Sequence, residues 1–124
     1  MIANLLTLVF LVSQPVADTA EPVEAETAMP LNAAQQGALR CSAAFALVAE
    51  KQKQGDPAAL EYPPLGERGR EFFVRSGAQL MDQAGMTRET LAAHLRREVD
   101  AIRADGSLEQ IMPPCLLLLD ASGL

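Results

Sequence analysis

The chain has no tryptophan, one tyrosine, one histidine and two cysteines among its 124 residues. So few histidines and cysteines leave little material for a zinc site or a catalytic triad. No G-x-S-x-G, P-loop, G-x-G-x-x-G or H-E-x-x-H motif occurs. We therefore expect no catalytic residue, no cofactor and no metal site, and the sequence predicts a protein that is not an enzyme.

Basic residues are outnumbered by acidic ones, and the net charge is −6 with a pI near 4.7. Binding to nucleic acid through phosphate neutralisation is therefore not expected. No apolar run approaches the ~18 residues of a stable membrane span. The hydrophobic share of 49% is too high for a disordered chain. One folded domain at most fits this length.

An apolar run over residues 2–12 begins the chain and ends at Ser13-Gln14-Pro15. Its length is typical of a signal-peptide core, which predicts a signal peptide over residues 1–17 with an uncertain cleavage site and a periplasmic or secreted protein. No Lys or Arg precedes the run, and an apolar first helix packed on the domain is the alternative. Residues 18–31 carry four acids and no base, which indicates an acidic flexible linker before a domain over residues 32–124.

Helical periodicity dominates residues 32–124, and no segment alternates like a strand. The spacing of Ala38, Cys41, Phe45 and Val48 predicts a helix over residues 33–54, capped by Asn32. Further helices are expected over residues 67–84, capped by Gly85, and over residues 88–105, capped by Thr87. Between the first two, residues 57–66 are expected to form a connection, extended around residues 62–65. The fold class is thus all-α, a compact bundle of about four helices.

The fourth helix is expected to be short or broken. Ser107 and Gln110 form an S-x-x-Q capping box at its start, but Pro113 and Pro114 should break or kink it. The four leucines over residues 116–119 are expected inside the domain.

Two cysteines in an exported chain normally pair, which predicts a disulfide between Cys41 and Cys115. In the chain-entropy model, a disulfide that closes the long loop between these two cysteines stabilises the fold by about 4.5 kcal/mol. Two free buried thiols in a cytosolic protein are the alternative.

Arg68, Phe72 and Arg75 are the candidate interaction surface. Arg68 and Arg75 fall on one helix face with Glu71 between them, a spacing that indicates an ion-pair row. Phe72 lies off the main apolar stripe, so it is either an exposed aromatic beside guanidinium groups, as at protein interfaces, or a second core phenylalanine.

A pocket is the alternative site. It would lie near His94 and Glu98, or near Gly66–Arg70, where glycines and arginines at a helix start could bind an anion. Three methionines, Met81, Met86 and Met112, could line an apolar cavity between the helices. Alternatively, they simply fill the core.

The layout resembles small exported helical proteins with one long-range disulfide: periplasmic acid-stress chaperones, immunity proteins against secreted bacterial toxins, and uncharacterised exported proteins. The resemblance consists of the signal-like start, Cys41 in the first mature helix, and Pro114-Cys115 near the end. The chain lacks the extra cysteines of the immunity group and the lysine-rich composition of the acid chaperones, and no functional residue is transferred. Together these features predict a non-enzymatic protein that contacts a protein partner in the periplasm or cell envelope; a small ligand carrier or enzyme is the alternative.

Overall fold

A computed structural model describes residues 30–124, so the predicted signal peptide and most of the predicted linker lie outside the described residues. This part of the chain contains five helices and no strand, which confirms the all-α bundle. The helices are α2 (Ala33–Lys53), α3 (Pro57–Leu60), α4 (Gly66–Ala84), α5 (Arg88–Asp105) and α6 (Leu108–Ala121).

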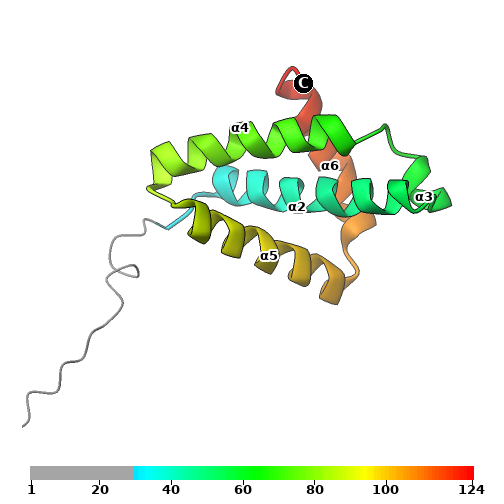
Figure 1. Ribbon diagram of the computed structural model, residues 1–124, viewed down its shortest axis with the longest axis horizontal. Coiled ribbons are helices and arrows are strands. Elements are labelled where there is room, and N and C mark those ends of the chain that lie inside the picture. The colour runs from blue at the N-terminus through cyan, green and yellow to red at the C-terminus, as the bar shows by residue number, and fades with distance from the viewer. Residues whose placement is uncertain (1–29) are drawn as a thin grey trace, which may run out of the picture.

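Helix α2 is the centre of the bundle and packs against each of the other four helices. Figure 1 shows α2 between α4 and α5, with α6 crossing behind it and α3 at its C-terminal end. The sequence explains this position, because Ala43, Ala44, Phe45 and Val48 are completely buried. A helix that buries so much of its circumference has to be surrounded on several sides.

The predicted caps at the starts of α2 and α5 and at the end of α4 are confirmed. Asn32 forms a capping box with Gln35, and Thr87 forms one with Thr90. Gly85 and Gly106 adopt the left-handed conformation that ends α4 and α5, as glycine does at no steric cost.

The connection after α2 contains a helical turn that the sequence reasoning did not predict. Asp56 accepts hydrogen bonds from the amides of Ala58 and Ala59 and thereby caps α3. The side chain of Gln52 holds the rest of this connection to α2. Its Nε2 donates to the carbonyls of Ala59 and Pro63, each at 3.0 Å, and its Oε1 accepts from the amide of Leu65 at 3.1 Å.

Helix α6 continues through Pro113 and Pro114, so the expected break is wrong. A proline removes a hydrogen bond to the carbonyl four residues earlier. Here those carbonyls belong to Glu109 and Gln110, both exposed residues, so water can replace the lost donors. The expected capping box is also absent, because the Ser107 side chain makes no cap hydrogen bond and its hydroxyl is buried without a partner in the described chain.

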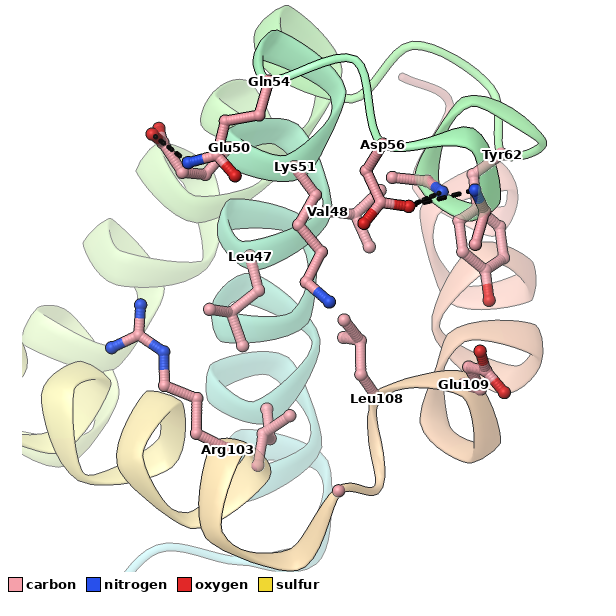
Figure 2. A pocket seen from close by; sticks show the side chains of 14 residues that line it. Leu47, Val48, Glu50, Lys51, Gln54, Asp56, Tyr62, Arg103, Leu108 and Glu109 are labelled. Carbon is pink, nitrogen blue, oxygen red and sulfur yellow. Dashed lines mark hydrogen bonds between the residues drawn. The ribbon is translucent and has the colours of Figure 1, made fainter.

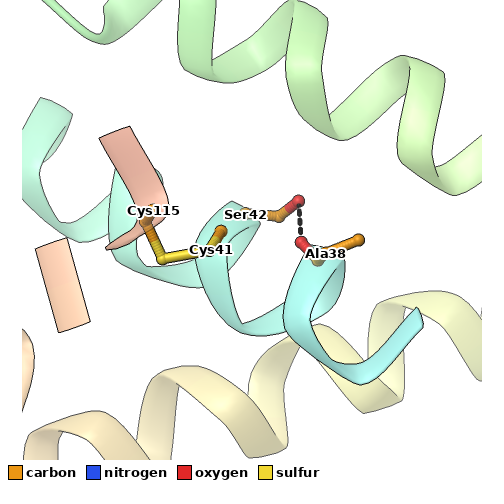
Figure 3. Close-up of a disulfide and its surroundings, with 4 residues drawn as sticks. All are labelled: Ala38, Cys41, Ser42 and Cys115. Carbon is orange, nitrogen blue, oxygen red and sulfur yellow. Dashed lines mark hydrogen bonds between the residues drawn. A yellow bond between two sulfur atoms is a disulfide. The ribbon is translucent and has the colours of Figure 1, made fainter. Parts of the chain in front are cut away.

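Cys41 and Cys115 lie at disulfide distance, with the two Sγ atoms 2.09 Å apart and the Cα atoms 5.2 Å apart, which confirms the predicted pair (Figure 3). Both residues are buried. The bond holds the middle of α6 against the N-terminal half of α2. Met112 and Leu119, each 0% exposed, complete the buried face of α6.

Gly69 allows α4 to approach α2 closely, because a Cβ atom there would lie 2.9 Å from the Cβ of Phe45. Gly69→Ala should therefore lower the free energy of unfolding by about 1–2 kcal/mol, through overpacking, although alanine favours helices. The matched control is Gly37→Ala in α2, where an added Cβ meets nothing within 4 Å. This substitution should raise the free energy of unfolding by about 0.5–1 kcal/mol. Urea unfolding measures both; equal stabilisation by the two substitutions would contradict the close approach.

Candidate functional site

Arg68 and Arg75 bind the end of the chain. The guanidinium of Arg68 donates to the main-chain oxygen of Leu124 at 2.7 and 3.1 Å, and to Asp120 Oδ1 at 3.2 Å. Arg75 donates to the carbonyl of Ser122 at 3.4 Å. The Arg68–Asp120 contact is the one ion pair found within residues 30–124, so the expected row through Glu71 does not form. Two residues proposed as a contact surface thus have a structural role.

Phe72 is buried, so the expectation that it contributes exposed aromatic surface is wrong. Its exposed fraction is 4%, and its ring meets that of Phe45 edge to face with the centroids 5.3 Å apart. Phe72 belongs to the same core cluster as Cys115 and Leu119 of α6. The alternative, a second core phenylalanine, is the one that the structure confirms.

The outer face of α6 is the largest departure from the expected burial. Leu116 is partly buried and Leu119 is fully buried, but Leu117 and Leu118 are 72% and 40% exposed. Pro113 and Pro114 are also exposed, on the same side of the helix one turn earlier. We define the outer face of α6 as Pro113, Pro114, Leu117 and Leu118. No charged residue occurs from Ile111 to Leu119, so this face is entirely apolar.

Sequence reasoning did not predict this face because it expected Pro113 and Pro114 to break or kink the helix. Successive residues of a helix point about 100° apart, so four consecutive leucines cannot all face one core. A continuous helix over residues 108–121 would have placed two of them outside. The expectation that all four leucines lie inside therefore depended on a break or kink at the prolines.

His94 and Glu98 lie on α5, outside the lining of the two hollows that this part of the chain shows most clearly. Both are half-buried. Burial lowers the pKa of the His94 imidazole from its ordinary 6.5, the nearby Arg97 lowers the pKa further, and Glu98 partly opposes both effects. His94 is therefore mostly neutral at pH 7.

The Gly66–Arg70 stretch borders a small cavity of about 220 Å³ between α2 and α4. Its lining is almost wholly apolar and includes Phe45, Leu65 and Phe73. Arg70 is the one charged residue in that lining. The second expected pocket thus exists as a hollow, but it lacks the convergent polar groups that orient a ligand.

A larger groove of about 580 Å³ opens at the C-terminal end of α2, between α3, the end of α5 and the start of α6. Figure 2 shows Leu47, Val48 and Leu108 around its middle, with the Lys51 ammonium group extending between them. Arg103, Asp56 and Glu109 stand at its edges. Sequence reasoning did not find this groove, because its wall depends on α3 and on the bonds made by Gln52.

Metal-binding clusters and membrane-spanning helices are both absent from the described residues. No group of three or more His, Cys, Asp or Glu side chains within residues 30–124 is arranged to hold a metal ion. Nor does this part of the chain contain a helix with the length and apolar character needed to cross a membrane.

Arg68→Met should lower the free energy of unfolding by about 1 kcal/mol, because it removes charge-assisted hydrogen bonds at a partly exposed site. It should also speed amide hydrogen exchange in residues 120–124. Arg70→Met is the matched control, since Arg70 is exposed on the same helix and makes no hydrogen bond to the end of the chain. If both variants exchanged at the same rates, Arg68 would not hold this segment.

Stability should depend on the protonation of His94. The unfolded chain binds this proton at higher pH than the folded chain, so the contribution of His94 is complete above about pH 6.5 and is lost as the pH falls through 6.5 toward the lowered pKa. In His94→Gln the loss of stability between about pH 7.5 and 5.5 should be smaller than in the unsubstituted protein. An NMR titration of the imidazole with a midpoint at or above 6.5 would contradict this.

No family model matches the chain, and neither the curated proteins nor the solved structures include a match to it. The function therefore has to be argued from the surfaces and cavities of this chain. Two features of the described residues stand out for that purpose: the outer face of α6 and the groove at the end of α2.

Proposed function

We propose that this chain is an exported, non-enzymatic protein that acts through contact with a protein partner, and that the outer face of α6 is its contact surface. The observation that carries the proposal is the exposure of Leu117 and Leu118 in a stretch without charge. Leu117 is the most exposed of the large apolar side chains in residues 30–124. The partner would be a protein in the periplasm or cell envelope.

Burial of this face against a partner would be favourable. Removing a fully exposed leucine from water contributes roughly 1.5–3 kcal/mol, and the outer face of α6 adds two proline rings to its two leucines. Apolar side chains scattered singly over a surface need no explanation, whereas adjacent ones mark contact sites more often. The other strongly exposed large apolar side chains, Leu60 and Val74 at 58% and 61%, lie singly on other helices and do not extend the outer face of α6.

The face is also held in position before any partner arrives. The Cys41–Cys115 bond fixes the middle of α6 to α2, and Arg68 fixes its end through Asp120 and Leu124. Little conformational freedom would be lost when α6 binds, and such preorganisation strengthens association.

Export is supported by two features. The apolar run over residues 2–12 has the length of a signal-peptide core. A buried disulfide is stable in oxidising compartments and rare in the cytosol. The absence of a catalytic motif from the sequence favours binding over chemistry.

A photo-crosslinking amino acid introduced at position 117 in the native host tests the contact surface. We expect a discrete adduct of higher mass at position 117, and its loss when Leu118→Asp is combined with the label. Position 60 is the matched control, because Leu60 is similarly exposed on α3. The proposal fails if position 117 yields no adduct, or if positions 117 and 60 yield the same set of adducts.

A further inference from the structure

The groove at the C-terminal end of α2 lies apart from the outer face of α6 and is a second candidate binding site. Its walls come from four helices, and one wall is the α3 connection that Gln52 holds to α2 through three hydrogen bonds to main-chain oxygens. The volume of about 580 Å³ falls within the range of ~300–1,000 Å³ that small-molecule sites occupy.

The inner surface of the groove is apolar and firmly placed. Val48 and Ile102, 0% and 1% exposed, lie beneath its floor, and Leu47 is 8% exposed. Ala59 of α3 and Leu108 of α6 complete this surface. These side chains belong to the main core cluster or pack against it, so a ligand would meet a surface that is already formed. An apolar body is what such a surface accommodates.

Lys51 supplies the positive charge in the middle of the groove (Figure 2). Within residues 30–124 no carboxylate lies within ion-pairing distance of Lys51 or of Arg103 at the edge. The carbonyls at the end of α2 do not need Lys51 either. Those of Glu50, Lys51 and Gln52 already accept hydrogen bonds from the amides of Gln54, Asp56 and Gly55, respectively.

The lining also contains three acidic residues, Glu50, Asp56 and Glu109. Asp56 accepts hydrogen bonds from the amides of Ala58 and Ala59. Glu50 accepts one from the side chain of Gln54 at 3.4 Å. Figure 2 shows the carboxylates of Glu50 and Glu109 pointing outward, away from the Lys51 ammonium group. These carboxylates keep their charge, so three carboxylates and the Arg103 guanidinium border the groove, and the Lys51 ammonium group supplies the positive charge in its middle.

We infer that this groove binds a small amphipathic anion, a molecule with one carboxylate and an aliphatic body such as a medium-chain fatty acid. The aliphatic body lies over the apolar floor at Leu47 and Leu108, and the carboxylate pairs with the ammonium group of Lys51. This inference does not depend on the proposed function, because it concerns other residues and another kind of ligand.

Dodecanoate, below its micelle concentration, is the probe. We would titrate it into the oxidised full chain by NMR and by calorimetry, with dodecanol and dodecyltrimethylammonium as neutral and cationic analogues. Chemical shifts should change at the groove, in residues 47–51, 58–62 and 102–109. Lys51→Met keeps the aliphatic stem and should weaken dodecanoate binding roughly fivefold, the size expected for a solvent-exposed ion pair, with little effect on dodecanol.

Lys53→Met is the matched control, since Lys53 is exposed in the same turn of α2 but does not line the groove; it should bind dodecanoate like the unsubstituted protein. Higher salt should weaken dodecanoate binding to the unsubstituted protein more than to Lys51→Met. The inference is overturned if dodecanoate does not bind, if Lys51→Met and Lys53→Met bind it equally, or if the cationic analogue binds as tightly. It is also overturned if the shifts map to the outer face of α6, which Leu117→Ser would show by abolishing binding.

Discussion

The bond between Cys41 and Cys115 joins the last helix to the central one across 74 residues of sequence, and the arrangement of α6 depends on it. Alone, α6 is a weak helix, because its two prolines remove main-chain hydrogen bonds and much of its apolar surface faces water. A cross-link over such a loop stabilises the fold by about 4.5 kcal/mol in the chain-entropy model, comparable with the whole stability of a small domain. The bond lets α6 keep an exposed apolar face without loss of the fold.

The two proposed binding regions follow from the way the other helices surround α2. Its N-terminal half carries Cys41 and therefore positions α6, whose inner face joins the main core while Leu117 and Leu118 on its outer face stay exposed. Its C-terminal end carries Lys51, which supplies the positive charge in the middle of the groove, and Gln52, which holds one of the groove's walls. A contact surface and a ligand groove can thus exist on one small domain without competing for the same residues.

Local signals in the sequence predicted α2, α4 and α5, the caps at Asn32 and Thr87, and the pairing of the two cysteines. These features depend on residues close together in the chain, or on the simple rule that two cysteines pair. The burial of Phe72 could not be predicted in the same way, because it depends on α4 packing against Phe45 of α2. The groove requires four elements to meet and a bonding pattern of Gln52 that spacing alone does not reveal. The exposure of Leu117 and Leu118 can be predicted from the sequence if α6 is treated as one continuous helix.

The central claim is that this is an exported domain held together by one disulfide. The most direct test is the intact mass of the protein isolated from its native host, measured without and then with a reducing agent. The account predicts a chain shortened at its N-terminus that gains two hydrogens on reduction. A chain that retains residues 1–17 and carries two free thiols before reduction would contradict both the export and the covalent link between α2 and α6.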